Sequence, residues 1–253
     1  MTYEEICNYI YEIPKFTKKN SLEHTKEMLQ RLSIREHQFE IIHVAGSNGK
    51  GSVCAFINQV LVEHGYEVGL FTSPHLVCME ERFVINGEKC SQEEFVESFE
   101  AVQKVVEQME AEGLPHPAFF EYLFAMGMYL FQKQKVHYLI LETGLGGRLD
   151  ATNVFEEPLL TIITSISLEH TQILGDSIEA IAGEKAGIIV PGVPVIYDGN
   201  NPEAAQVIRK QAEALGSPYY EVKKENTEIL RNTSAGIDFC MENEYYGNTA
   251  FSI

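Results

Sequence analysis

A glycine-rich segment, GSNGKGS at residues 46–52, carries the residue types that bind phosphate. It follows an apolar run at residues 40–45, predicted to be a strand, and leads directly into a helical pattern. In such a loop, glycines let backbone N–H groups turn toward a phosphate and the helix N-terminus adds its dipole. Lys50 would supply a positive charge, and the Ser52 hydroxyl can ligate Mg²⁺. The order strand, glycine loop, helix therefore favours a phosphate site over a plain glycine turn.

The spacing differs from that of the standard P-loop. In this sequence the first glycine, Gly46, comes three residues before Gly49, whereas the standard loop has five. Gly51 also separates Lys50 from Ser52, which are adjacent positions in the standard loop. We therefore predict a variant loop, whose phosphate-binding residues are Ser47, Asn48, Gly49, Lys50, Gly51 and Ser52.

Polar side chains also follow other predicted strands. Glu142 ends an apolar strand at residues 137–142, and His170 comes after the strand at residues 159–165. Ligands bind at the carboxyl ends of parallel strands, and Mg²⁺ between phosphates takes one or two carboxylates. Glu142 is therefore the first metal candidate. Imidazole is a less usual magnesium ligand, so from the residues alone His170 is equally a loop hydrogen-bonder.

Two further segments could contribute to the same edge of the sheet. Ser73 and His75 follow the strand predicted at residues 67–72, in a loop that Pro74 constrains. Lys185 lies in a helix of small residues, where a solvated lysine is as reasonable as a functional one. The glycines at residues 144–147 do not make a dinucleotide fingerprint, because the sixth position is leucine and no helix clearly starts there.

Short apolar runs alternate with longer helical patterns, which is typical of an α/β protein with a doubly wound, mostly parallel sheet. Further strands are expected at residues 194–197, and helices at 4–13, 21–32, 50–64, 91–112, 118–133, 177–187 and 202–215. We expect one P-loop domain over residues 1–216. Residues 217–253 are polar and turn-rich, which predicts a small β appendage that is cut short.

Composition excludes several classes of protein. With 37 acidic and 19 basic residues among 253, the net charge is −18, which disfavours nucleic acid as a partner. The most apolar stretch, residues 118–131, contains Glu121 and is too short to span a membrane. Five cysteines without a CxxC pair suit a reducing cytoplasm. We expect a cytoplasmic monomer without a membrane partner.

Six motifs in this order resemble those of folylpolyglutamate synthase and dihydrofolate synthase, a family of Mur ligases. They are GSNGKGS at 46–52, TSPHL at 72–76, FE at 120–121, ETGLGGRLDATN at 142–153, EHT at 169–171 and GEKAGI at 183–188. The resemblance implies ATP-dependent amide formation. A carboxylate of folate or dihydropteroate attacks the γ-phosphate of ATP, and the amino group of L-glutamate then attacks the acyl phosphate.

The resemblance also implies roles for single residues. Magnesium ions would be held by Ser52, Ser73, Glu142 and His170, and the catalytic groups would be Lys50, Lys185 and His170. The lysine that matches Lys185 is carbamylated in the family, where it helps to organise a second metal site. The folate or pteroate pocket would include His75, Arg82, Phe120, Arg148 and Asp150. Phe120 is equally well explained as a core residue, and the two arginines could instead pair with neighbouring acids.

Members of this family carry a second, C-terminal α/β domain, which has no counterpart in these 253 residues. We therefore expect nucleotide binding, with catalysis depending on that domain, because closing a site against water needs both halves. The alternatives are a truncated, non-catalytic ATP-binding module and a P-loop NTPase or kinase. The variant loop spacing disfavours the kinase.

Overall fold

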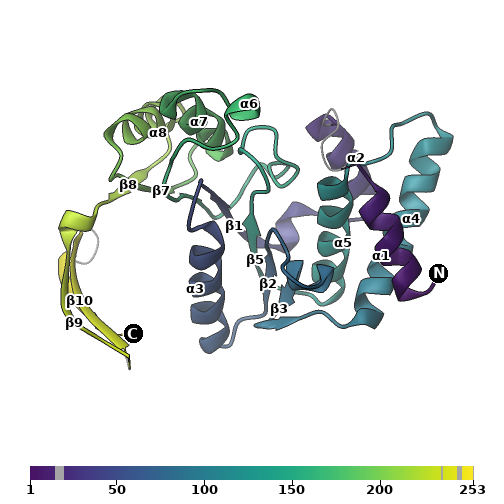
Figure 1. Cartoon of the computed structure of the whole chain (residues 1–253), viewed down its shortest axis with the longest axis horizontal. Coiled ribbons are helices and arrows are strands. Elements are labelled where there is room, and N and C mark those ends of the chain that lie inside the picture. The colour runs from purple at the N-terminus through teal and green to yellow at the C-terminus, as the bar shows by residue number, and fades with distance from the viewer. Residues whose placement is uncertain (15–19, 235, 244–246, 253) are drawn as a thin grey trace.

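An eight-stranded sheet forms the centre of the computed structural model, which describes residues 1–14, 20–234, 236–243 and 247–252. The strand order is β4-β3-β2-β5-β1-β6-β7-β8 (Figure 1). All neighbours from β2 to β8 pair in parallel, whereas β3 and β4 are antiparallel at one edge. The strands are β1 Glu40–Ala45, β2 Val68–Phe71, β3 Phe83–Ile85, β4 Glu88–Lys89, β5 Tyr138–Glu142, β6 Leu160–Ile163, β7 Val195–Asp198 and β8 Tyr219–Val222.

Helices cover both faces of this sheet (Figure 1). The helix α3 packs on one face, against β1, β2 and β5. The opposite face carries two groups of helices, one around α5 and the other made of α7 and α8. The helices are α1 Tyr3–Glu12, α2 Leu22–Arg31, α3 Lys50–Glu63, α4 Gln92–Ala111, α5 Phe119–Lys133, α6 Thr171–Leu174, α7 Ile178–Lys185 and α8 Pro202–Ala214.

Side chains that alternate in direction along each strand explain why both faces of the sheet are buried. In β1, Ile42 and Val44 point to the α3 side, whereas Ile41 packs with the α5 group. Residues one apart in a strand face opposite sides of a sheet, so a continuous apolar strand buries both. Helix α5 is buried over most of its length because it lies between the sheet and α4. Among the described residues, no helix is long and apolar enough to cross a bilayer.

Local signals set the helix boundaries. Thr2 and Glu5 form a capping box at the start of α1, and Ser91 with Glu94 forms another at α4. Each pair satisfies two backbone N–H groups that the first helical turn leaves without an acceptor. Asn201 caps α8, whose first residue is a proline.

The predicted fold class, a mostly parallel doubly wound sheet flanked by helices, is confirmed. Strands β3 and β4, which form a hairpin, the single turn α6 and the edge strand β8 were not expected in the main body. The hairpin strands have three and two residues, too few to show an alternating pattern.

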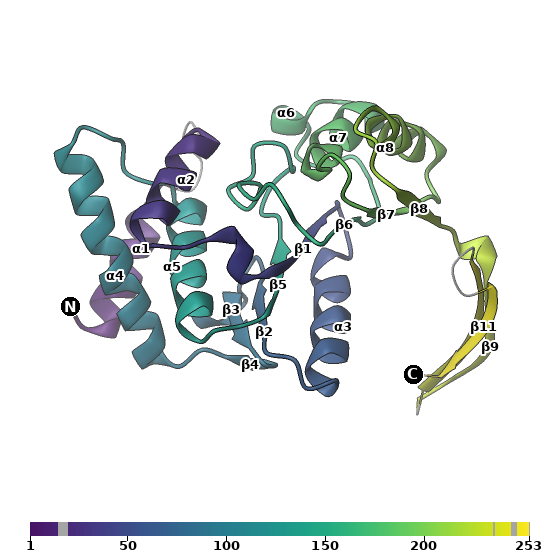
Figure 2. The same ribbon diagram turned by 180° about the vertical axis from the view of Figure 1, so that it is seen from behind.

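A separate three-stranded antiparallel sheet follows the main body, in the order β11-β10-β9. Its strands are β9 Thr227–Thr233, β10 Gly236–Asn243 and β11 Gly247–Ser252, and Figure 2 shows it apart from the body on the side of α3. The appendage predicted from residue 217 therefore begins later, because β8 pairs in parallel with β7 in the main sheet. As the edge strand, β8 keeps Tyr219 and Tyr220 exposed, so its sequence lacks the apolar signature of a buried strand.

Candidate functional site

The predicted phosphate loop lies between the end of β1 and the first turn of α3. Gly46 leaves β1 so close to β6 that a Cβ atom there would lie 1.8 Å from Oγ1 of Thr164. Gly49 has φ +85° and is the N-cap of α3, a conformation that glycine adopts without strain. The first N–H groups of α3, from Lys50 onward, have no acceptor inside the helix and are available to an anion.

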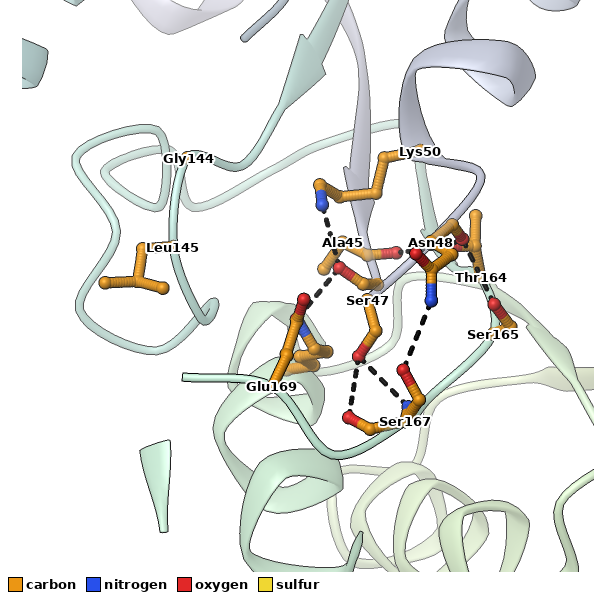
Figure 3. A network of polar contacts seen from close by, with 12 residues as sticks. Ala45, Ser47, Asn48, Lys50, Gly144, Leu145, Thr164, Ser165, Ser167 and Glu169 are labelled. Carbon is orange, nitrogen blue, oxygen red and sulfur yellow. Dashed lines mark hydrogen bonds and ion pairs between the residues drawn. The ribbon is translucent and has the colours of Figure 1, made fainter. Parts of the chain in front are cut away.

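Hydroxyl groups from the segment after β6 hold the loop in shape (Figure 3). Thr164 and Ser165 donate to the carbonyl oxygen of Asn48 at 2.8 and 3.2 Å. The Ser47 hydroxyl donates to the Ser167 carbonyl at 3.1 Å and accepts from its N–H at 3.1 Å. Asn48 Nδ2 donates to Ser167 Oγ at 3.2 Å. The side chains of Ser47 and Asn48 thus fix the loop, and the Ser47 N–H is also engaged, donating to the Ser165 carbonyl oxygen at 2.8 Å.

Two lysines converge on one carbonyl oxygen of the loop. Lys50 Nζ donates to the Gly46 carbonyl at 2.9 Å, and Lys185 Nζ donates to the same oxygen at 2.8 Å. Lys185 is 1% exposed and forms an ion pair with Glu169 at 2.7 Å. Burial lowers the pKa of Lys185, and the Glu169 carboxylate opposes this shift. Lys185 is therefore a buried cation of the site and not a solvated surface lysine.

Glu142 lies at the end of β5, facing the first turn of α3. It is 4% exposed, and one carboxylate oxygen accepts the Ser73 N–H at 3.0 Å. The same oxygen, Oε2, would lie 3.7 Å from a Cβ atom added at Gly51, and Oε1 would lie 3.9 Å from it. Burial raises the pKa of Glu142, while the charges of Lys50 and Arg82 act against the rise. A buried carboxylate with a raised pKa therefore lies next to the phosphate loop.

His170 occupies a different position. It is exposed, has φ +45° and directly precedes α6. No contact with Glu142 is present, and the described residues contain no group of three or more His, Cys, Asp or Glu side chains placed to hold a metal ion. Magnesium bound to phosphates needs few protein ligands, so a single carboxylate together with serine hydroxyls is a reasonable donor set.

A chain of three side chains runs from α1 to the loop after β2. Arg82 Nε donates to His75 Nδ1 at 2.8 Å, and His75 Nε2 lies 3.1 Å from the Tyr11 hydroxyl. Arg82 is 5% exposed, and its guanidinium lies over the Phe119 ring, 5.6 Å from the centroid. Its buried Nη1 has no hydrogen-bond partner among the described residues. Tyr11 was not predicted, because a tyrosine in an amphipathic helix gives no sign of a distant partner.

Glu81 is a second residue that the sequence did not reveal. Its carboxylate accepts the backbone N–H groups of Leu76, Val77 and Cys78 at 2.7 to 3.0 Å. These hydrogen bonds lower the pKa of Glu81 to about 2. The loop that carries Ser73 and His75 is therefore anchored from within.

A buried polar chain organises the segment after Glu142. Asp150, 1% exposed, accepts the N–H groups of Gly144 and Leu145 at 2.9 Å each. Its other oxygen accepts the Thr152 hydroxyl at 2.6 Å, and that hydroxyl accepts from His43 Nε2 at 2.8 Å. Burial lowers the pKa of His43 to about 4, which keeps the ring neutral. His43 lies in an apolar strand, and its polar role could not be inferred from that pattern.

The remaining predicted pocket residues are on either side of this segment. Phe120 is half-buried, and its ring would lie 2.7 Å from a Cβ atom at Gly144. Its ring also contacts Phe71 edge to face. Phe120 therefore packs in the core and also contacts the segment that contains Gly144. Arg148 is exposed and engaged with α7, through the Glu184 carboxylate at 3.3 Å and the Gly183 carbonyl at 3.1 Å.

Comparison with known proteins gives consistent matches. No protein-family model matches the chain. It is 44% identical over 218 residues to the dihydrofolate synthase/folylpolyglutamate synthase of Bacillus subtilis, covering 86% of this chain and 50% of that protein. It is 35% identical over 226 residues to a folylpolyglutamate synthase of Arabidopsis thaliana, covering 88% and 40%. The chain thus spans about half the length, or less, of these two relatives.

Solved structures agree with these matches. The apo form of L. casei FPGS superposes with a TM-score of 0.91 at 30% identity, covering 100% of this chain and 62% of that one. E. coli FolC in complex with DHPP and ADP gives a TM-score of 0.83 at 29% identity, covering 98% and 57%. The similarity therefore includes the whole described fold.

Proposed function

This chain is a homologue of the folylpolyglutamate and dihydrofolate synthases, and we propose that it forms the nucleotide- and acid-binding part of an ATP-dependent ligase. In the proposed reaction, a carboxylate oxygen of a folate or dihydropteroate attacks the γ-phosphorus of ATP, and ADP leaves. The amino group of L-glutamate then attacks the acyl carbon, and phosphate leaves as the amide forms.

The observation that carries this proposal is the juxtaposition of the phosphate loop with Glu142. The N-terminus of α3 offers backbone N–H groups, and the buried carboxylate faces it from β5. In an acidic chain, such a local device is what allows an anion to bind. We assign the phosphates of ATP to residues 47–52, with Lys50 as their point charge. A solved FPGS structure similar to this chain contains the ATP analogue AMPPCP.

The residues proposed for Mg²⁺ fit that ion by their chemistry. Glu142 supplies a carboxylate, and Ser52 and Ser73 supply hydroxyl oxygens on the two segments that flank it. His170 is the fourth proposed ligand, although it is exposed and its residue type favours other metals. A bound magnesium ion would neutralise charge on the phosphoryl group that is transferred. Lys50 would act on the same charge.

Lys185 has two proposed states. In the structure its Nζ lies between a carbonyl oxygen and the Glu169 carboxylate, which are the contacts of an ammonium group. Carbamylation, which the family resemblance implies, would place a second anion beside Glu169. Two such anions repel each other unless a cation lies between them. The modified form therefore requires a metal ion near Glu169, whereas the ammonium form is stable by itself.

The acid substrate is proposed to bind near the loop after β2 and the segment after β5. Its candidates are His75, Arg82, Phe120, Arg148 and Asp150. Phe120 and the adjoining Gly144 offer a flat apolar surface, and Arg82 offers a buried cation. Asp150 serves this pocket by holding Gly144 and Leu145 through their N–H groups.

Measuring ADP release tests the proposal. The chain is incubated with ATP and Mg²⁺, first with dihydropteroate alone and then with dihydropteroate and L-glutamate. Because catalysis is expected to depend on the family's C-terminal domain, we expect turnover only when that domain is supplied, and then ADP only with the acid and amide only with glutamate. An equal rate of ADP release with and without dihydropteroate would instead identify a nucleotide hydrolase.

A further inference from the structure

Arg82 is a buried cation that lacks a carboxylate partner. Its side chain is 5% exposed, and no ion pair joins it to any described aspartate or glutamate. One guanidinium nitrogen, Nη1, is fully buried and makes no hydrogen bond among those residues. Burying a charge is costly unless it is paired, and native structures satisfy nearly all buried donors. A donor left in this state is suited to an anion that arrives with a ligand.

The hydrogen bonds around His75 fix how this guanidinium is held. Arginine has no acceptor, so Nε–H must donate to Nδ1 of His75, and that nitrogen is unprotonated. In the neutral ring the proton is then on Nε2, which donates to the Tyr11 hydroxyl. Tyr11 thereby selects the tautomer that accepts from Arg82. The Nε edge is engaged by His75, and the Nη1 donor remains for a ligand.

Arg82 is already a candidate for the acid pocket, and we propose that Tyr11, acting through His75, is the positioning residue that aims its guanidinium at the substrate carboxylate. This inference rests on the proposed ligase function and adds to it a residue of α1, an element that is otherwise structural. The substrate group required is a carboxylate, because the planar guanidinium matches its two oxygens.

The surroundings of Arg82 agree with this role. The charges of Arg82 and Glu142 act on each other's pKa, so the guanidinium lies within electrostatic range of that carboxylate. A carboxylate held there would be near the phosphate loop that Glu142 faces. The Phe119 ring covers the guanidinium and excludes water from one side, which strengthens any charge-assisted bond.

The test compares two ligands on four forms of the chain. Dihydropteroate and its analogue without the carboxylate are titrated into the wild type, Arg82→Gln, Tyr11→Phe and Tyr9→Phe. The last is a matched control, because the Tyr9 hydroxyl also contacts a histidine, His116 Nε2 at 3.0 Å, away from this site. ATP affinity is measured for every form as a check on folding.

The wild type should prefer the carboxylate by about tenfold or more, as expected for a hydrogen bond to a charged group. Arg82→Gln should lose this preference, Tyr11→Phe should reduce it severalfold, and Tyr9→Phe should retain it. If Arg82→Gln misfolds and loses ATP binding, the comparison of Tyr11→Phe with Tyr9→Phe decides. An unchanged preference for the carboxylate in Tyr11→Phe or in folded Arg82→Gln overturns this inference but not the proposed ligase function. Failure of the wild type to bind either pterin overturns the proposed function as well.

Discussion

Lys185 donates a hydrogen bond to the carbonyl oxygen of Gly46, 139 positions earlier in the chain, at 2.8 Å. The bond joins the last turn of α7 to the first residue of the phosphate loop. Lys50 donates to the same oxygen, so a buried cation and a loop cation share one acceptor. The conformation of the loop therefore depends on α7, which lies on the opposite face of the sheet from α3.

Replacement of Lys185 by methionine should destabilise the chain. The substitution leaves the partly buried Glu169 carboxylate and the Gly46 carbonyl without their shared donor. Breaking a buried pair from one side costs about 3–5 kcal/mol, and the partial exposure of Glu169 reduces this to about 2 kcal/mol. Urea unfolding measures the change. Lys133→Met, which removes an exposed ion pair with Glu97, should cost less than about 1 kcal/mol.

Lys50→Ala should remove most of the affinity for ATP and leave the fold intact. Among the described residues its Nζ bonds only to the Gly46 carbonyl of the loop, and it lies at a helix N-terminus that tolerates alanine. We expect ATP affinity to fall by at least about tenfold, with the unfolding midpoint close to that of the wild type. Lys26→Ala, which removes an exposed ion pair with Glu156, is the control. Equal ATP affinity in Lys50→Ala and Lys26→Ala would contradict the loop assignment.

Glu142→Gln should stabilise the chain and impair magnesium binding. Burial raises the folded pKa of Glu142 above its unfolded value, so ionising it costs stability as pH rises through that interval. Glutamine stays neutral and can still accept the Ser73 N–H. At neutral pH the variant should therefore unfold at higher urea than the wild type, and the gain should vanish below the unfolded pKa of about 4.3.

The same variant should lose the dependence of ATP affinity on Mg²⁺, measured with and without EDTA. If the variant keeps the full magnesium dependence of the wild type, Glu142 is not a ligand.

Asp150→Asn should distort the segment after β5. The amide can place only one oxygen among donors, so its NH₂ would face either the Gly144 and Leu145 N–H groups or the Thr152 hydroxyl. Unsatisfied buried donors cost about 1–3 kcal/mol each. We expect a loss of stability in this range and faster hydrogen exchange in residues 144–153. Exchange as slow as in the wild type would show that Asp150 does not hold the segment.

Much of the fold was predictable because its signals are local. Strand β1 was predicted with its observed bounds, and α5 was recognised because fifteen residues of apolar periodicity leave little alternative. The hairpin of β3 and β4 was missed because its strands are too short to carry a pattern. Edge strand β8 was missed because one exposed side removes the apolar run that marks buried parallel strands.

The site was predictable where its polar residues lie at the carboxyl ends of predicted strands. Glu142 and Ser73 were placed at the same edge of the sheet from their positions after β5 and β2, and the structure joins them by a hydrogen bond. Lys185 could not be distinguished from a surface lysine, because its burial depends on contacts far away in the chain. Tyr11 and His43 act through long-range hydrogen bonds, which leave no periodic trace in the sequence.

The nucleotide site is tested by calorimetric titration of the 253-residue chain with ATP, in the presence and absence of Mg²⁺. We expect saturable binding at one site, tightened by Mg²⁺ and weakened by at least about tenfold in Lys50→Ala. Absence of binding to the folded chain, or binding that neither Mg²⁺ nor Lys50→Ala affects, would contradict the assignment of residues 46–52 and Glu142 as a nucleotide site.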